Sequence, residues 1–534
     1  MSARVSRCVL LLALSIVFLA LTPIADLEGI ATQSTTVVSE PEKRGMLLAG
    51  TPHGPIVIDG DANFSATALL EGWPGDGSPE TPYIVDGLDI DLGGGFGHCI
   101  MICNTRVSFT ISNCVLTEAN ATIDFATPGD IVKISVGTGI YLQNVSNGEL
   151  INNACNHNTG RGIYLEGSSY NRLANNTCNN NNNNGDTIVL GGGILLRNSE
   201  SNTVVDNTCT SNGWLGIYLE NSHNNIVSNN TCSNSTWNSI ELASSDFNIV
   251  DNNTCNNNSN FGIHLLDSDS NTVTDNTCST NAWHGIHLAF SDSNTVDNNT
   301  CNSNTCRGIC LERSSYNRLT KNTCNNNILA GIELYGSESN TVVDNTCTSN
   351  QRGIYLVDSV SNTLTNNACN RNDESGIRLQ GSESNNVISN TCSSNAEYGI
   401  HLYDSHQNTA TANICSNNRI GIYLIFSESN TVTRNTCLSN TENDICLDDS
   451  ESNTVVYNIT TEVYSTLLLL GGVLLLLSPG IVVLGLRRRM VSSKGDKDDI
   501  AVPVRYRLVS RLHKRKSLKH EFADETLEPD SSDQ

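Results

Sequence analysis

A pattern of about 23 residues recurs along most of the chain. Each copy reads Gly-Ile-x-Leu, then a Ser-rich stretch, then Asn, then Asn-x-Cys and a further Asn. Fourteen copies run from Gly139 to Leu447, with Ser239 and Asp444 in place of glycine in two of them. A fixed period of this length decides which residues become neighbours, so it constrains the fold before any single residue is interpreted.

The apolar residues of each copy alternate, which is typical of β-strands. Ile163 and Leu165 point to one side and Tyr164 to the other. A second strand is expected around Leu173 and Val204, a third surrounds the repeated Cys, and the residues between them favour tight corners. The pattern therefore predicts an all-β fold, a single-stranded parallel β-helix solenoid with ~23-residue coils that stack at about 4.8 Å.

The repeated Cys keeps this register. It occurs at 155, 178, 209, 232, 255, 278, 301, 324, 347, 369, 392, 415 and 437. The single long step is expected to be a loop around Asn179 to Asp186 that bulges from an intact stack. An Asn precedes each of these Cys by two residues, and another follows each Leu by six. We expect these amides to form hydrogen-bonded ladders along the axis.

Twenty Cys residues leave two interpretations open. Stacked Cα atoms about 4.8 Å apart lie within the range that a disulfide permits. One Cys per coil also fits a small, buried hydrophobic residue, and we expect mostly free thiols. Cys306 and Cys310 lie near Cys301 in the same coil and are the better candidates for a disulfide or for metal ligands.

Both ends of the chain carry targeting features. Residues 1–25 resemble a secretory signal peptide, and 26–98 are expected to form an N-terminal cap and irregular coils before the repeats of 99–460. Residues 466–486 contain no charge and are long enough for a transmembrane α-helix. Arg487 follows at once, so the tail 487–534 is expected in the cytoplasm and the repeats outside the cell membrane.

The chain is strongly acidic, with a net charge of −25. This balance excludes nucleic acid as an expected partner, because phosphate would be repelled. The membrane, glycans and surface-layer proteins remain the expected partners. Asn-x-Ser/Thr sites such as Asn63 and Asn120 also make a glycoprotein plausible if the host glycosylates surface proteins.

The Gly-Ile-x-Leu, Ser-x-x-Asn-x-Val and Asn-x-Cys coil resembles the NosD-like, right-handed parallel β-helix repeats of periplasmic copper-binding proteins. These are related to carbohydrate-binding and sugar-hydrolase β-helices. The resemblance covers roughly residues 50–460 and includes the opening segments 53–60 and 72–77. It implies a right-handed β-helix on a surface protein of archaeal type, and it supplies no copper motif that transfers residue by residue.

The residue between Ile and Leu, which we call the variable column, is expected to face outward. In the middle of the chain this column reads Glu241, His264, His287, Cys310 and Glu333. Imidazole, thiolate and carboxylate groups are ligands of zinc and copper, so the first four are candidate metal ligands. The alternative is that they are ordinary exposed residues of a strand face.

Two further rows are candidates for ligand binding. Trp214, Trp237 and Trp283 precede their strands by two residues and, with Tyr218, form an aromatic group that could bind sugar rings. An acidic row could bind calcium or could be a solvated corner. It consists of Glu200, Asp246, Asp269, Asp292, Glu338, Glu383 and Glu428.

No pair of carboxylates is placed as a glycosidase requires, since Glu241 and Glu333 are expected to be four coils apart, about 19 Å. The leading hypothesis is a membrane-anchored extracellular protein that is structural or binds glycans, without an evident catalytic cluster. The alternatives are a polysaccharide-active hydrolase or lyase on the same scaffold and a protein that handles copper or zinc.

Overall fold

The computed structural model describes residues 50–120, 122–127, 130–135, 137–181 and 191–466, which belong to one compact unit. The expected signal peptide, the transmembrane segment beyond Thr466 and the tail lie outside the described residues. No helix within these ranges is long and apolar enough to cross a membrane.

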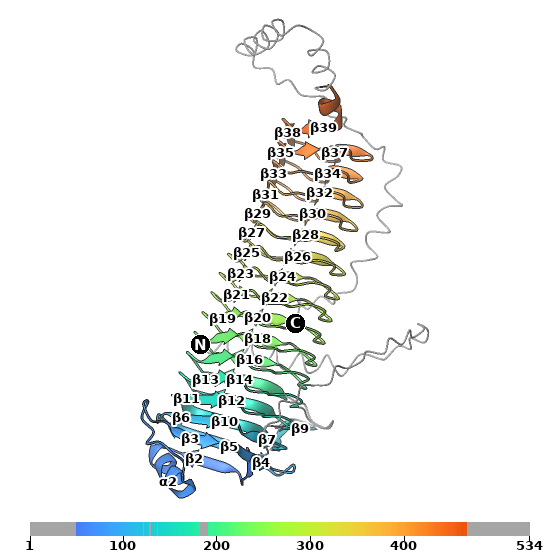
Figure 1. The fold of residues 1–534 in the computed structure, drawn as a ribbon. Helices are drawn as coiled ribbons and strands as arrows, with labels where there is room; N and C mark the ends of the chain where they lie inside the picture. The colour runs from blue at the N-terminus through green and yellow to red at the C-terminus, as the bar shows by residue number, and fades with distance from the viewer. Residues whose placement is uncertain (1–49, 121, 128–129, 136, 182–190, 467–534) are drawn as a thin grey trace, which may run out of the picture. The chain divides into compact units, whose positions relative to one another are not determined.

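The chain winds through successive coils, so that strands far apart in sequence lie side by side (Figure 1). Two parallel sheets of 16 strands each run along the stack. We call them the Ile-Leu sheet and the Val sheet after their inward side chains. The Ile-Leu sheet contains β2 (Ile56–Asp59), β5 (Ile100–Thr105), β10 (Thr138–Val145), β12 (Arg161–Glu166), β14 (Gly192–Arg197), β16 (Ile217–Glu220), β18 (Ile240–Ala243), β20 (Ile263–Leu266), β22 (Ile286–Ala289), β24 (Ile309–Glu312), β26 (Ala330–Tyr335), β28 (Arg352–Val357), β30 (Ser375–Gln380), β32 (Tyr398–Tyr403), β34 (Ile420–Ile425) and β37 (Asn443–Asp448).

The Val sheet follows the Ile-Leu sheet in each coil. It contains β3 (Tyr83–Asp86), β6 (Phe109–Ser112), β11 (Gly148–Ile151), β13 (Arg172–Ala174), β15 (Thr203–Val205), β17 (Ile226–Ser228), β19 (Ile249–Asp251), β21 (Thr272–Thr274), β23 (Thr295–Asp297), β25 (Arg318–Thr320), β27 (Thr341–Val343), β29 (Thr363–Thr365), β31 (Asn386–Ile388), β33 (Thr409–Thr411), β35 (Thr431–Thr433) and β38 (Thr454–Val456).

The third side of the coil carries the repeated Cys. It opens with the parallel strands β1 (Thr51–Pro52), β4 (Leu88–Asp91) and β7 (Val115–Thr117) and closes with β36 (Thr436–Cys437) and β39 (Ile459–Thr460). Between them, single bridges such as Thr254 to Thr277 join successive coils. The third strand predicted from the sequence is thus reduced to one bridged residue in most coils.

The core is a set of identical columns. Ile and Leu of the first sheet, Val or Leu of the second and the repeated Cys are nearly all 0% exposed along the stack. Ile163 pairs with Ile194 in register, although the coil between them is the longest. The predicted parallel β-helix and its intact stack are therefore confirmed, while residues 182–190 of the long loop lie outside the described part of the chain.

The amide ladders are also confirmed. Asn276 Oδ1 accepts bonds from the backbone N–H and from Nδ2 of Asn253, at 2.9 and 3.0 Å. Nδ2 of Asn276 donates to the carbonyl of Val250, at 2.9 Å, and to Oδ1 of Asn299, at 3.0 Å. One side chain thus satisfies buried groups in neighbouring coils, which a corner cut off from water requires.

All 19 Cys residues of the described ranges are free and buried. The expectation of mostly free thiols is therefore confirmed. Cys306 and Cys310 are among the free residues, so the disulfide predicted as an alternative for this pair is not formed in the structure. Burial raises the pKa of ladder thiols such as Cys278 and Cys324 well above the usual value, because no cation stabilises a thiolate in the core.

Two elements interrupt the regular coils near the N-terminus. Helix α2 (Asp61–Glu71) covers the first coil with Phe64 and Ala68, and the Phe64 ring stacks on Tyr83 with centroids 5.1 Å apart. An antiparallel hairpin of β8 (Thr122–Thr127) and β9 (Asp130–Ser135) is inserted before β10. The repeat pattern predicted neither element, because both precede the regular copies.

Candidate functional site

The variable column lies on the outer face of the Ile-Leu sheet, in register from coil to coil. Glu241 pairs with His264, His264 with His287, and His287 with Cys310. These side chains stand outside the core columns, as expected from strand alternation. They are nevertheless covered: Glu241 and His287 are each 8% exposed and Cys310 is 5% exposed. The prediction of an exposed column is therefore wrong in its solvent accessibility.

Side chains from the corner before each strand provide this cover. The Trp214 ring lies 5.4 Å from that of Tyr218, and Phe261 lies 4.9 Å from His264 and 4.8 Å from His287, between ring centroids. Further along, the guanidinium of Arg307 reaches Glu333, with Nε and Oε2 2.6 Å apart. Two residue columns thus form a second, outer layer over the Ile-Leu sheet.

The two imidazoles stack instead of converging. The rings of His264 and His287 are parallel within 5° at a centroid distance of 5.1 Å. Nδ1 of His264 lies 3.8 Å from Glu241, and Nε2 of His287 lies 3.7 Å from Glu312. Burial lowers the pKa of His287 to about 4, so this imidazole is neutral near pH 7.

No three His, Cys, Asp or Glu side chains of the described residues form a group that could hold a metal ion. Stacked rings direct their nitrogen lone pairs sideways, parallel to each other, and this does not suit a shared ion. Cys310 lies next to Arg307 and Glu333, which already pair with each other. The four predicted metal ligands therefore do not converge on one position in the described part of the chain.

The tryptophans lie along one edge of the outer layer. The backbone N–H of Trp237 donates to the backbone carbonyl of Trp214, so these two residues stand in adjacent coils. The backbone N–H of Trp283 donates to the carbonyl of Asn260, so Asn260 takes the place of a tryptophan in the coil between Trp237 and Trp283. Trp237 is 37% exposed and Trp283 is 44% exposed. The predicted aromatic row is thus brought together with one gap, and its two later members are open to solvent.

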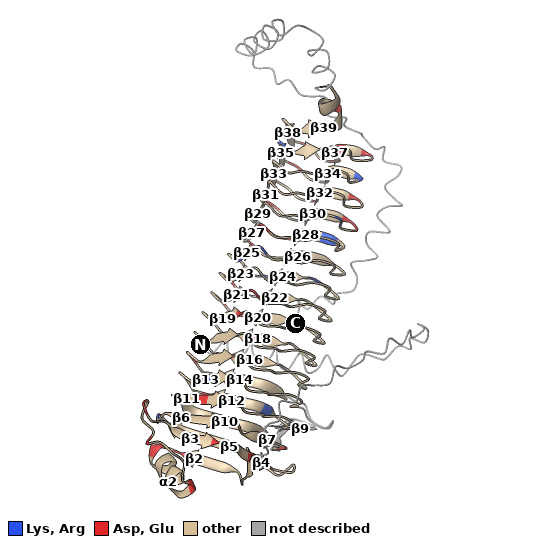
Figure 2. Cartoon of the chain, viewed as in Figure 1, with Lys and Arg blue, Asp and Glu red and all other residues tan. Residues whose placement is uncertain are grey.

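A second cluster on the same face was not singled out from the sequence. Arg352 and Arg378 both lie over the Tyr355 ring, with Cζ at 4.7 and 5.6 Å from its centroid. Glu374 accepts from both guanidinium groups, at 2.8 and 2.7 Å. We call this part, with the coils up to Tyr423, the arginine-tyrosine stretch. In Figure 2 blue and red occupy short stretches of a mostly tan ribbon, and one blue stretch lies on β28.

His401 is the centre of the later coils of this stretch. Its ring lies 4.4 Å from Tyr398 and 5.3 Å from Tyr423, between centroids, and it is 1% exposed. Arg419 donates to the Tyr398 hydroxyl at 2.7 Å. Burial, then the nearby Arg378, lowers the pKa of His401 well below its usual value. The signal in the sequence was the alternation of Tyr, Arg and His in the variable column.

The acidic row forms a ladder on another corner. Asp246 Oδ1 accepts the N–H of Asp269, Asp269 Oδ1 accepts that of Asp292, and Asp292 Oδ1 accepts that of Ser315, at 2.7, 2.7 and 2.6 Å. Each of these carboxylates already satisfies the backbone of the next coil. Calcium binding by the row stays a prediction.

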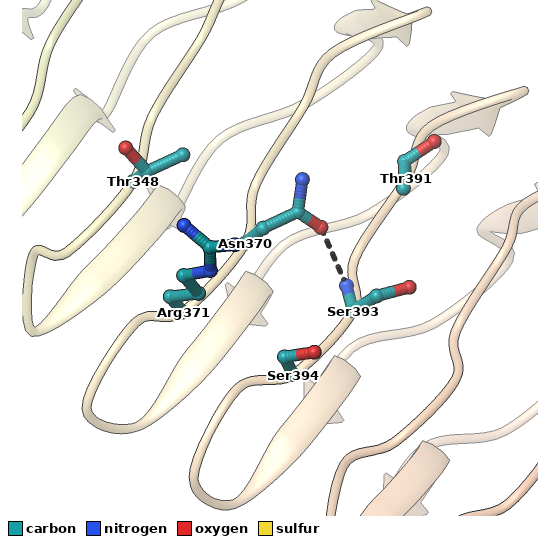
Figure 3. Close-up of a pocket in the computed structure, with 6 residues that line it drawn as sticks. All are labelled: Thr348, Asn370, Arg371, Thr391, Ser393 and Ser394. Carbon is teal, nitrogen blue, oxygen red and sulfur yellow. Dashed lines mark hydrogen bonds between the residues drawn. The ribbon is translucent and has the colours of Figure 1, made fainter.

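A shallow cavity of about 320 Å³ opens on the third side of the coils (Figure 3). It is lined by Thr348, Asn370, Arg371, Thr391, Ser393 and Ser394. Asn370 Oδ1 accepts the N–H of Ser393 at 2.8 Å. Hydroxyl, amide and guanidinium groups can hydrogen-bond a polar ligand, but none of these residues belongs to the predicted site.

Three solved structures are similar to this chain at low identity and with TM-scores below 0.5. A double mutant of the periplasmic alginate epimerase AlgG is 14% identical, with 66% of this chain and 84% of that chain covered and a TM-score of 0.43. The A-module of a mannuronan C-5 epimerase from Azotobacter vinelandii is 15% identical, with coverage of 59% and 89% and a TM-score of 0.40. A mannuronic acid specific polysaccharide family 6 lyase from human gut microbiota is 11% identical, with coverage of 67% and 87% and a TM-score of 0.36.

Sequence comparisons agree with the observed coils. No curated protein matches the chain. The family model described as a periplasmic copper-binding protein, NosD, matches residues 370–471. The model described as a right-handed β-helix region matches residues 98–278 and 265–413, which together span more than half of the sequence. The chain therefore belongs to the right-handed β-helix family, with NosD-like repeats in its C-terminal coils.

Proposed function

We propose that the chain is a cell-surface protein that binds polysaccharide along the outer face of the Ile-Leu sheet. The observation that carries this proposal is the outer layer of stacked rings and guanidinium groups between Trp214 and Tyr423. Scaffold columns repeat one residue type, whereas this layer varies from coil to coil and places different chemistry at a constant spacing of about 4.8 Å.

The exposed indoles of Trp237 and Trp283 provide the contact surface in this proposal. An aromatic face with negative charge density packs well against the C–H groups of a sugar ring. The partly exposed Arg352 and Arg419, with side chains 18% and 38% exposed, add donors that suit hydroxyl or carboxylate oxygens. A linear glycan parallel to the stack would meet these groups in succession.

Affinity electrophoresis of the full chain through gels that contain single polysaccharides tests the proposal. We expect the doubly substituted chain with Trp237→Ala and Trp283→Ala to lose most of the retardation of the unmodified chain. Leu69→Ala is the matched control, because Leu69 is a large apolar side chain, 86% exposed, on helix α2. Equal retardation of all three proteins would contradict the proposal.

The surface location is a further part of the proposal. It is supported by the apolar segment 466–486 followed by Arg487, and by the periplasmic description of the matching NosD model. Extraction of membranes with alkaline carbonate should leave the full chain in the pellet. Protease added to intact cells should degrade the coils and leave a short C-terminal fragment.

A polysaccharide-active enzyme is the second candidate, and the cluster around His401 favours it. Tyr398, His401 and Arg419 bring a phenol, an imidazole and a cation together, and these are groups that transfer protons or stabilise charge in catalysis. If the chain is such an enzyme, incubation with a polysaccharide should form new reducing ends or unsaturated products. Their loss in Tyr398→Phe, with binding retained, would favour an enzyme over a binding protein.

A further inference from the structure

Three exposed aromatic residues stand at regular intervals on a single corner of the stack. Tyr170, Phe247 and Tyr316 are 70%, 61% and 66% exposed and occupy the same position of their coils, just before the buried Asn that opens the Val sheet. Ser201 and Asn224 fill this position in the two coils between the first pair, and Ser270 and Ser293 do so between the second pair. We call this column the aromatic corner.

The backbone at this corner disfavours large side chains. Tyr170, Phe247 and Tyr316 have φ values of 60°, 58° and 59°, in the left-handed region. Ser270 and Ser293 adopt φ values of 58° and 59° at the same position, so the corner does not require an aromatic residue. A bulky residue at positive φ is strained, and an exposed ring gains nothing from core burial. Folding therefore does not account for these three rings.

The spacing and the neighbours of the rings indicate a ligand. Three coils separate successive rings, about 14 Å along the axis. The acidic ladder runs beside the second interval, since Asp246 precedes Phe247, and Asp269 and Asp292 follow in the next two coils. Each carboxylate uses Oδ1 for the backbone of the next coil. Oδ2 of Asp269 and Asp292 has no hydrogen bond within the described residues and can accept one from a hydroxyl group.

We propose that the aromatic corner is a second polysaccharide-binding strip and that it takes a neutral, hydroxyl-rich linear glycan. Ring faces at positions 170, 247 and 316 would stack on sugar rings, while the carboxylates between them accept hydroxyl hydrogen bonds. Asp246, Asp269 and Asp292 repel uronate or sulfate groups between Phe247 and Tyr316, so this interval favours a neutral glycan. A second copy of this chain is a poor occupant as well, because its net charge is −25.

This inference rests on the proposed glycan binding but places it on a different side of the coil from Trp237 and Trp283. The test is a triple substitution of Tyr170→Ser, Phe247→Ser and Tyr316→Ser in the full chain. Serine is the residue that neighbouring coils carry at this position, so the stack should remain folded, as circular dichroism and thermal unfolding will show. Affinity electrophoresis with galactomannan and with mixed-linkage β-glucan gives the affinity, and polygalacturonate serves as the acidic glycan.

We expect the triple variant to bind the two neutral glycans more than about tenfold more weakly, as three stacking contacts are lost. Retardation by polygalacturonate, which the guanidinium groups of the outer layer can contact, should be the same for the triple variant and the unmodified chain. Tyr457→Ser is the matched control. Tyr457 is 78% exposed with a φ of 58°, but it lies on another corner, where Ser389 occupies the same position of an earlier coil. This control should bind like the unmodified chain.

The outcomes separate the two proposals. Unchanged neutral-glycan affinity in the triple variant, together with loss of affinity in the Trp237→Ala and Trp283→Ala variant, overturns the aromatic corner and leaves the proposed function in place. Loss in the triple variant alone supports the corner and contradicts the outer layer. A change in sedimentation of the triple variant without a change in glycan affinity would instead assign the rings to self-association. No binding of neutral glycans by the unmodified chain overturns the inference.

Discussion

Gly376 lies so close to Cys392 that a Cβ atom at position 376 would stand 2.7 Å from the Cβ of that Cys. The same atom would stand 2.7 Å from the carbonyl oxygen of Gly399 in the next coil. Real Cβ atoms do not approach backbone and core atoms this closely. The glycine of the repeat is therefore a packing requirement of the Cys column, and not a requirement for positive φ.

The first prediction concerns this contact. Gly376→Ala should destabilise the stack by about 1–3 kcal/mol, because the Cys392 side chain and the Gly399 backbone must move to admit one methyl group. Thermal unfolding of the full chain measures the loss. Gly167→Asn is the control, since nothing lies within 4 Å of a Cβ at Gly167 and Asn198 occupies the same corner of the next coil with a φ of 49°. A fall in melting temperature for the control as large as that for Gly376→Ala would contradict the packing explanation.

The repeat predicted the coils well because each column sees the same environment in every coil. Ile163 and Ile194 occupy equivalent positions of successive coils, and so do Asn253 and Asn276. The period of the repeat therefore predicts both contacts. The substitution of Ser239 for glycine shows the limits of that rule. Its hydroxyl bonds the carbonyl of Cys232 and accepts a bond from Asn258, so a polar side chain replaces packing with hydrogen bonds.

The outer layer was predicted less well, for a physical reason. Strand alternation places Tyr218 and His287 outside the core, but it says nothing about side chains that lean over from a corner. Trp214 and Phe261 supply that cover through ring contacts across and between coils. Such contacts depend on rotamers and not on periodicity, so burial of the variable column could not be read from the sequence.

The second prediction concerns the thiol ladder. A maleimide reagent at pH 8 should label few of the ladder thiols in the folded chain, and all of them after denaturation. The pKa of Cys278 is raised well above its usual value by burial, so the reactive thiolate is scarce and the reagent is excluded. Mass spectrometry of labelled peptides gives the answer. Rapid labelling of Cys278 in the native state would show that the coils open locally.

The third prediction is a loss of stability on mild acidification. Burial lowers the pKa of His287 to about 4, below the value of about 6.5 for an unfolded chain. The unfolded state therefore binds more protons between these values, and stability falls as the pH drops from about 6.5 to 4. The full shift corresponds to about 3 kcal/mol. His284 and His401 shift in the same direction and add to the effect.

Substitution of His287 by Tyr tests the assignment. Tyr218 and Tyr423 occupy the same column in other coils, so the replacement fits the outer layer. The variant should show a smaller decrease in melting temperature between pH 7 and pH 4 than the unmodified chain. His53, a half-buried residue before the first regular coil, provides the control as His53→Gln. An identical pH dependence in the unmodified chain and in the His287→Tyr variant would assign the acid sensitivity to other groups.

The fourth prediction concerns the amide ladder. Asn276→Leu keeps a similar volume but removes the acceptor for the backbone N–H and the side-chain amide of Asn253 and the donor for the Val250 carbonyl. Each buried group left without a partner costs about 1–3 kcal/mol, so the substitution should lower stability by more than about 3 kcal/mol. Asn252→Gly is the control, because Asn252 is an exposed corner residue with a φ of 52°, which glycine adopts easily.

Because neighbouring coils depend on one another, the Asn276→Leu substitution should also affect hydrogen exchange. Backbone amides of the coils next to Asn276 should exchange before those at the ends of the stack. Protection that stays uniform along the stack would show that the coils tolerate a broken ladder.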